Sequence, residues 1–168
     1  MALVIEDGTI VSGANSYVAT IEARSYAASR SLSLPADDAA LEALLLNAID
    51  YLESKRQLYQ GSKVSETQAL QWPRTDVFVD GIYIAATVIP DLLKSAQIRL
   101  ATIAYSGVDL MPTRSGPIVK KEKVGPIETE YSETVGTTIE PSMTVIDYLL
   151  APLLKSKMSQ FFLKTVRV

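Results

Sequence analysis

The sequence predicts a mainly α-helical domain, a small bundle of four to five helices with an extended β-hairpin arm and an extended C-terminal tail. Three observations lead to this prediction. The chain has 168 residues, 48% of them hydrophobic, which suits one compact domain with a substantial core. Two long segments carry apolar residues at helical spacing. A third segment is broken by prolines and glycines and is rich in β-branched residues.

The strongest helical pattern covers about residues 36–56. Pro35 precedes it, and Asp37 and Asp38 place negative charge at the positive end of the helix dipole. One face carries the apolar residues Leu41, Leu44, Leu45, Ala48, Ile49 and Leu52. We therefore expect this face to lie in the core.

A second strong pattern runs over residues 90–106, and Gly107 supplies its C-terminal stop. Its predicted buried stripe consists of Leu92, Leu93, Ala96, Leu100, Ile103 and Ala104. Ile98 and Tyr105 fall on the other side. This indicates a helix packed on two sides, either within the fold or against another subunit.

Three weaker patterns complete the predicted helical core of about residues 20–107 and 142–154. A helix is expected at 20–30 with Thr20 as its N-cap, and a short one at 65–71 that ends before Pro73. A last helix is expected at about 142–151, where Pro152 should end or kink it. Trp72, the single tryptophan, is predicted to be a packing anchor.

The region between the last two helices predicts a β arm at about residues 117–132. Segments 118–124 and 127–131 are joined across Gly125-Pro126 and could form a hairpin with charge on both faces. Such a hairpin has little apolar surface to bury in its own domain, so we expect it to contact other subunits or a larger assembly. The candidate arm residues are Lys120, Lys121, Lys123, Glu128, Glu130 and Tyr131.

The tail at residues 155–168 contains four basic and no acidic residues. It suits an acidic partner surface or phosphate, although a solvated end with incidental charge explains the same pattern. Its last residues alternate as in a strand that needs a partner. The candidate partner-binding residues are Lys155, Lys157, Phe161, Phe162, Leu163, Lys164, Val166 and Arg167.

The composition excludes several kinds of chemistry. The chain has no cysteine and no histidine, which removes disulfides, zinc sites built on these residues, and Ser-His-Asp or Cys-His catalysis. It also has no Gly-rich phosphate-binding motif. Three carboxylate pairs fit turns, helix starts or a solvated hairpin better than a metal or acid–base site: Asp37/Asp38, Asp76/Asp80 and Glu128/Glu130. We therefore expect no enzyme activity, no cofactor and no metal.

Charge and hydropathy bear on location and partners. The first eight residues lack the basic start of a signal peptide, and no apolar stretch reaches the roughly 20 residues of a membrane span, so no membrane partner is expected. A net charge of −3 argues against a general nucleic-acid binder. The candidates for stacking on a single strand are Trp72-Pro73-Arg74, Tyr83, Tyr131 and the Phe161/Phe162 pair near Lys164.

Several motifs together resemble a known family. They are VIEDGTIVSGANSYVATIEARSYAASR at the start, AIDYLES at 48–54, QALQWPRTDV at 68–77, IPDLLKSAQIRLA at 89–101, KKEKVGPIETEYSE at 120–133, and the closing YLLAPLL. In this order they resemble tailed-phage and prophage proteins that are labelled DnaT-like single-stranded DNA-binding proteins and look like head-to-tail connector adaptors.

The resemblance implies a structural virion protein that is made in the host bacterial cytoplasm and located in the neck. Such an adaptor forms a twelve-fold ring beneath the portal, contacts stopper or tail-terminator proteins, and lets DNA pass without sequence-specific binding. The alternative is a DnaT-like single-stranded DNA-binding replication protein. The acidic charge and the few aromatic residues favour the adaptor.

Overall fold

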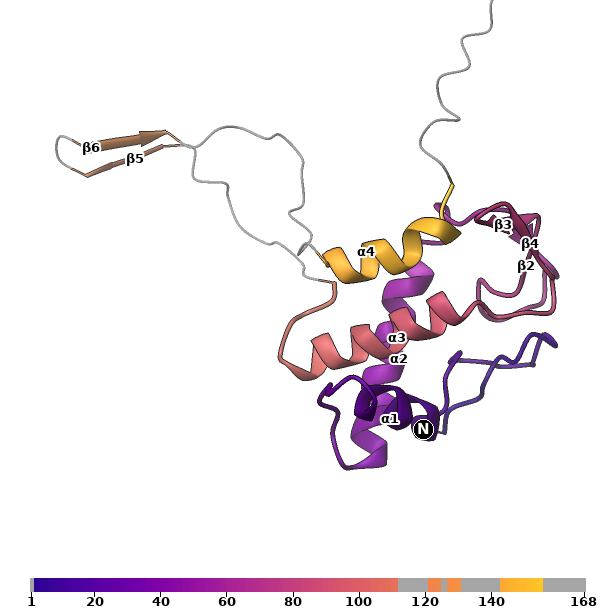
Figure 1. Ribbon diagram of the computed structural model, residues 1–168. Coiled ribbons are helices and arrows are strands. Elements are labelled where there is room, and N and C mark those ends of the chain that lie inside the picture. The colour runs from indigo at the N-terminus through magenta and orange to yellow at the C-terminus, as the bar shows by residue number, and fades with distance from the viewer. Residues whose placement is uncertain (1, 112–120, 125–126, 131–142, 156–168) are drawn as a thin grey trace, which may run out of the picture. The chain divides into compact units, whose positions relative to one another are not determined.

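A computed structural model describes residues 2–111, 121–124, 127–130 and 143–155 of the chain (Figure 1). The chain divides into two units. One unit comprises Met1–Leu110 together with Met143–Val168, and the other is Met111–Ser142. The first unit holds all the described helices, and the second holds the strands of the predicted arm.

The described residues form helices together with small antiparallel sheets. The helices are α1 (Thr20–Ala28), α2 (Asp38–Ser54), α3 (Asp91–Tyr105), α4 (Thr144–Leu150) and the 3-10 helix η1 (Ala151–Leu153). The strands are β1 (Ser62–Lys63), β2 (Arg74–Thr75), β3 (Val77–Val79), β4 (Ile82–Ile84), β5 (Lys121–Val124) and β6 (Ile127–Glu130). The expectation of a helical bundle is therefore only partly correct, because the two-stranded sheets β1–β2 and β3–β4 accompany the helices in addition to the predicted hairpin.

Helix α2 forms where its apolar pattern predicts it. Asp37 is the N-cap, and its side chain accepts a hydrogen bond from the backbone nitrogen of Ala40 at 2.8 Å, so the helix begins two residues later than expected. The buried residues of the helix are Leu41, Leu45, Ala48, Ile49, Tyr51 and Leu52. Most of the predicted stripe is thus confirmed as core, whereas Leu44 is only half-buried.

Helix α3 packs against α1, α2 and α4, and Figure 1 shows α2 crossing it. This packing buries Ile98 as well as the predicted stripe residues Leu93, Ala96 and Leu100. The two-sided packing expected for this helix therefore lies within the fold. The helix ends before Gly107, whose φ of +91° is readily adopted by glycine.

The polar side chain of Gln97 is also buried in α3. Its Nε2 atom donates to Ser16 Oγ at 2.8 Å and to the carbonyl of Leu45 at 3.2 Å, and its Oε1 atom accepts from the backbone nitrogen of Tyr17 at 3.1 Å. These bonds tie the N-terminal segment to α2 and α3, because a buried amide is stable only when its donors and acceptor are paired.

The helix expected at 65–71 is absent, since these residues form turns. Gln68 explains the difference. Its Oε1 atom accepts from the backbone nitrogens of Val64 and Ser65, and its Nε2 atom donates to the carbonyls of Leu70 and Pro73. The side chain satisfies the backbone groups that a helix would have paired.

Two other helix termini differ from the prediction. Helix α1 has Ala19 rather than Thr20 as its N-cap and ends at Ala28. Near the C-terminus the α-helix ends at Leu150 and continues as the 3-10 turn η1, which contains Pro152. The expectation that Pro152 ends the α-helix is confirmed.

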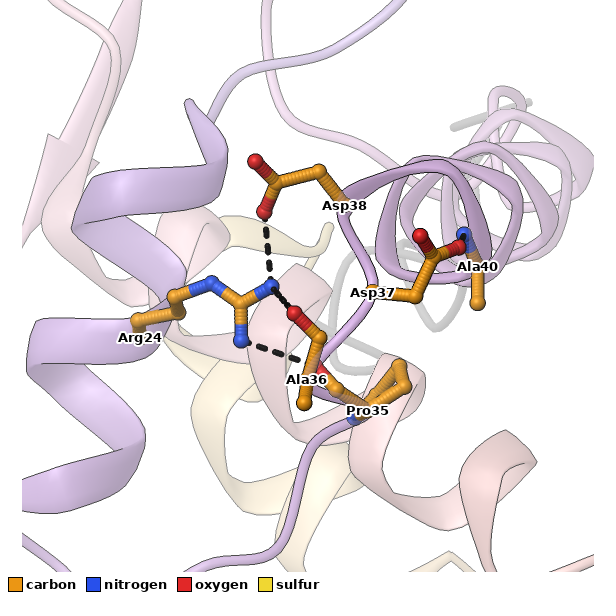
Figure 2. Close-up of polar contacts among 6 residues, drawn as sticks. All are labelled: Arg24, Pro35, Ala36, Asp37, Asp38 and Ala40. Atoms are coloured by element: carbon orange, nitrogen blue, oxygen red, sulfur yellow. Dashed lines mark hydrogen bonds and ion pairs between the residues drawn. The ribbon is translucent and has the colours of Figure 1, made fainter.

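Arg24 joins α1 to the start of α2 (Figure 2). Its guanidinium donates to the carbonyls of Pro35 and Ala36 at 2.7 and 2.8 Å and pairs with the Asp38 carboxylate at 2.7 Å. These three charge-assisted contacts fix the loop between the two helices. In the described part of the chain, no helix is long and apolar enough to cross a membrane.

The second unit contains the predicted hairpin. Strands β5 and β6 are antiparallel, with Lys121 opposite Glu130, Lys123 opposite Glu128, and Val124 opposite Ile127. The predicted hairpin across Gly125-Pro126 is therefore confirmed for these two strands. Tyr131 and Lys120 lie outside the described residues.

Candidate functional site

Two of the predicted single-strand contacts lie inside the fold. Trp72 is fully buried, and its indole packs edge-on against Tyr59 with ring centroids 5.8 Å apart. Arg74 is 6% exposed and donates to the carbonyls of Gln60 and Gly61 at 2.7 and 2.8 Å. The prediction that Trp72 is a packing anchor is confirmed. The prediction that Trp72-Pro73-Arg74 could stack on a strand is wrong, because these side chains hold adjacent loops together.

A buried polar network supports the same motif. The Tyr17 hydroxyl donates to Glu53 Oε1 at 3.0 Å and accepts from the backbone nitrogen of Trp72 at 3.2 Å. The backbone nitrogen of Gln71 donates to the same Glu53 oxygen at 3.0 Å. One carboxylate on α2 thus fixes the N-terminal segment and the loop that carries Trp72.

The network also shifts two pKa values. Burial raises the pKa of the Glu53 carboxyl above its ordinary value, although the hydrogen bonds from Gln71 and Tyr17 oppose this effect. Burial and the neighbouring Glu53 charge raise the pKa of Tyr17 well above its ordinary value. The Tyr17 hydroxyl therefore keeps its proton and its role as a donor to Glu53.

The β3–β4 hairpin presents an aromatic pair on the surface. Phe78 and Tyr83 are directly paired across the two strands and are 53% and 52% exposed. Their ring centroids are 5.6 Å apart with an interplanar angle of 61°. Val77, the strand neighbour of Phe78, is fully buried, so the hairpin has one face in the core and one face that displays the two rings.

The turn of this hairpin explains why the rings meet. Asp80 and Gly81 connect the strands and both have positive φ, at 52° and 79°, as a two-residue hairpin turn requires. This turn sets the register in which Val79 faces Ile82 and Phe78 faces Tyr83.

Gln60 attaches the hairpin to the C-terminal part of the first unit. Its Nε2 atom donates to the carbonyls of Phe78 and Pro152 at 3.2 and 2.8 Å, and its Oε1 atom accepts from the Phe78 backbone nitrogen at 3.3 Å. Strand β3 and η1 are consequently neighbours. The aromatic pair therefore lies on the same part of the unit as the residues at which the basic tail begins.

Lys155 is held at this point of the structure. Its backbone nitrogen donates to the carbonyl of Leu58 at 2.8 Å, and its Nζ atom donates to the carbonyl of Gln57 at 2.9 Å. Arg56 is exposed in the same turn after α2. We call Phe78, Tyr83, Arg56 and Lys155 the hairpin surface.

Most of the predicted partner-binding residues cannot be placed. Of that set only Lys155 is described, and the remaining residues, Lys157, Phe161, Phe162, Leu163, Lys164, Val166 and Arg167, lie outside the described residues. In the arm, the backbone positions of Lys121, Lys123, Glu128 and Glu130 are described. Tyr83 is the predicted stacking residue that the structure places on the surface.

The carboxylate pairs have structural positions. Asp37 caps α2, and Asp38 pairs with Arg24. Asp76 and Asp80 both adopt positive φ at loop positions beside β3. Within the ranges that the structure describes, three or more carboxylates do not gather into a group that could hold a metal ion.

Phe78 was missed at the level of the sequence. The segment VFVDGIYI places Asp-Gly between two alternating apolar runs, which is a strong signal for a hairpin with a two-residue turn. Counting outward from that turn would have placed Phe78 opposite Tyr83. The pairing of Phe78 with Tyr83 could therefore have been predicted from the Asp-Gly turn alone.

The described residues thus form helices mixed with small two-stranded antiparallel sheets, and the β3–β4 hairpin exposes an aromatic pair. The chain belongs to the family described as "Putative DnaT-like ssDNA binding protein", whose model matches residues 1–168. No curated protein and no solved structure matches the chain.

This family membership corrects the main functional prediction. The prediction of a virion head-to-tail connector is wrong, because the family that covers the whole chain is described by single-stranded DNA binding, which was the alternative, and the match gives no support to a connector. The connector prediction came from the motif resemblance, and the net charge of −3 was then used to prefer it over the alternative. Net charge averages over the whole chain, whereas a bound strand contacts one local surface.

Proposed function

We propose that this protein binds single-stranded DNA through the hairpin surface. The family description supports this function, and the observation that carries it is the exposed Phe78–Tyr83 pair. Proteins that bind single strands without sequence preference stack bases on exposed aromatic rings and follow the backbone with cationic side chains. The hairpin surface brings both kinds of group to one part of the unit.

The aromatic pair suits stacking because its rings are fixed but uncovered. Phe78 and Tyr83 support each other edge to face, and the turn at Asp80-Gly81 fixes the strands beneath them. About half of each residue is exposed to solvent. A base that stacks on such a ring gains about 1–3 kcal/mol, and every base has a face that can stack.

Phosphate contacts come from the cationic groups of the same surface. Arg56 is exposed, and Lys155 is exposed with two of its three ammonium N–H groups left after its bond to Gln57. In sequence, Lys155 is followed by Lys157, Lys164 and Arg167 with no acidic residue between them. We propose that these residues attract the phosphate backbone of the DNA independently of its sequence.

The first test measures binding of a labelled oligothymidylate by fluorescence anisotropy at low salt. Phe78→Ala combined with Tyr83→Ala should weaken binding about tenfold to a hundredfold, because the stacking energy is lost. Tyr105→Ala is the matched control, since Tyr105 is similarly exposed, at 49%, near the end of α3. Equal affinities of the double variant and the wild-type protein would refute the assignment of the hairpin surface.

A second prediction concerns the acidic residue at the hairpin turn. Asp80→Asn should strengthen binding about twofold at low salt, because the substitution removes a negative charge near the expected path of the strand. Asparagine tolerates the positive φ at this position, so the turn should be kept. The gain should disappear at high salt, where the charge is screened. A gain that persists at high salt would show that the substitution acts on structure rather than on charge.

A further inference from the structure

The first unit has nine described cationic residues. Arg24 and Lys94 pair with carboxylates. Lys63, Arg74 and Lys155 donate to backbone carbonyls, and Lys55 lies over the ring of Tyr51. The other three, Arg30, Arg56 and Arg99, have no carboxylate partner within the described ranges. Two of these three, Arg30 on the α1 side and Arg99 on α3, meet at one tyrosine.

Tyr26 holds both arginines. The Arg30 guanidinium carbon lies 3.7 Å above the centroid of the Tyr26 ring, and the Arg99 guanidinium carbon lies 6.0 Å from the same centroid. Arg99 Nε also donates to the Tyr26 hydroxyl at 3.1 Å. Cation–π stacking and this hydrogen bond restrict the two side chains before any ligand arrives.

The neighbouring acidic groups do not neutralise this pair. Glu22, one turn before Tyr26 on α1, is paired with Lys94 at 3.6 Å. Asp38 is paired with Arg24 at 2.7 Å. Among the described residues, the two positive charges at Tyr26 are therefore left without a carboxylate partner.

Hydrogen-bond donors remain free at both guanidiniums. Arg30 uses one N–H group for Ser29 Oγ at 2.8 Å, and Arg99 uses its Nε–H for Tyr26. A guanidinium has five N–H donors in a planar fork, so each arginine keeps others for a ligand. A shallow surface hollow of about 440 Å³ adjoins Arg30 and is lined by Ile21, Glu22, Ser25, Tyr26, Ser29 and Arg30.

We propose that Arg30 and Arg99, positioned by Tyr26, form a binding site for a phosphate group of a nucleotide or nucleic acid. Two guanidiniums at one tyrosine supply the positive charge that a phosphate group requires, and arginine suits phosphate oxygens better than lysine because it can donate two parallel hydrogen bonds. The hydroxyl of Ser25 lies at the same hollow and offers a further donor, whereas the Ser29 hydroxyl already donates to the Tyr26 carbonyl at 2.8 Å. The site uses none of the residues of the hairpin surface.

The test follows the arginine Nε–H signals of the full chain by NMR while inorganic phosphate is added. The signals of Arg30 and Arg99 should shift in a saturable manner with a dissociation constant of about 1–10 mM, as expected for one small anion at two charge-assisted contacts. Arg24 is the internal control, because its guanidinium is already occupied by Pro35, Ala36 and Asp38. Arg56 controls for a single exposed arginine.

Three further probes distinguish the sources of the phosphate group: thymidine monophosphate, oligothymidylate with a 5′-phosphate, and oligothymidylate without one. A preference for the two probes with a terminal phosphate would assign the site to a phosphomonoester. Equal shifts with both oligonucleotides would assign it to the strand backbone.

Variants separate this site from the hairpin surface. Arg30→Gln with Arg99→Gln should weaken phosphate binding at least about tenfold. Arg30→Gln alone keeps the Arg99–Tyr26 contact and serves as a control in case the double variant does not fold. Tyr26→Phe keeps the ring but removes the acceptor for Arg99, so it should weaken binding by less and broaden the Arg99 signal. The Phe78/Tyr83 double variant should bind phosphate as the wild-type protein does.

Two outcomes would overturn the proposal. One is a shift of the Arg30 and Arg99 signals that does not saturate or that equals the shift of Arg56. The other is unchanged phosphate affinity in the Arg30/Arg99 variant. Because inorganic phosphate is the probe, these outcomes do not depend on whether the hairpin surface binds DNA.

Discussion

Trp72→Ala is expected to lower the free energy of unfolding by about 3–5 kcal/mol, which is the usual cost of removing a large buried aromatic side chain and leaving a cavity. Trp72 is fully buried and packs edge-on against Tyr59. It therefore connects the loop before β2 to the chain that follows α2. Urea denaturation followed by circular dichroism would measure the loss without relying on tryptophan fluorescence.

Trp72→Phe is the matched control for this prediction. The indole nitrogen of Trp72 is buried without a hydrogen-bond partner, so phenylalanine removes an unpaired polar group while it keeps an aromatic ring. We expect a smaller loss of about 1–2 kcal/mol. A loss below about 1 kcal/mol for the alanine variant would show that Trp72 does not anchor the core.

Glu53→Ala is expected to lower the free energy of unfolding by about 2–4 kcal/mol. Its carboxylate accepts hydrogen bonds from the Tyr17 hydroxyl and the Gln71 backbone nitrogen, and alanine leaves both donors unpaired. Glu53→Gln keeps an oxygen that can accept both bonds and should stay within about 1 kcal/mol of the wild-type protein at neutral pH. Urea denaturation of the two variants measures the difference.

The free energy of unfolding of the wild-type protein and that of Glu53→Gln should also depend differently on pH. Burial raises the pKa of Glu53 in the folded state above the value it has in the unfolded chain. The stability that the protonated carboxyl contributes is therefore fully present below the unfolded value and is lost as pH rises through the folded value. Glu53→Gln should lack this loss. Parallel pH profiles for the wild-type protein and Glu53→Gln would contradict the effect.

The long helices could be predicted from the sequence because their signals are local. The apolar spacing along α2, the acidic residues at its start and the glycine after α3 act within a few residues of each other. Pro152 ends α4 for the same kind of reason, since it has no N–H group to continue the helix. The hairpin across Gly125-Pro126 follows from its turn residues.

The segment from 65 to 71 shows where local reasoning failed. Its residues permit a helix, but Gln68 binds four backbone groups between Val64 and Pro73 and holds the chain in turns. The strands β1 and β2 on either side then pair with each other. Their pairing joins Ser62 to Thr75 and Lys63 to Arg74, which periodicity within one short segment does not reveal.

Some residues of the candidate sites could likewise be predicted from local sequence, whereas others depend on tertiary packing. Tyr83 was among the residues considered for stacking, and its partner Phe78 was recoverable from the Asp-Gly turn between them. The burial of Trp72 and Arg74 and the meeting of Arg30 with Arg99 at Tyr26 depend on the packing of distant segments. Net charge contains no information about which side chains meet, so it could not decide between the connector and the single-strand binder.

By itself the sequence determined the two long helices, the stop at Pro152, the β5–β6 hairpin and the absence of cysteine and histidine chemistry. Only the tertiary structure decided that Gln60 joins strand β3, which carries Phe78, to Pro152 near the start of the basic tail. It also decided that Arg30 and Arg99 meet at Tyr26 without a carboxylate partner among the described residues. The physical reason is that helix periodicity and turn chemistry act between near neighbours in the chain. Burial and charge pairing depend instead on which distant segments the core brings together.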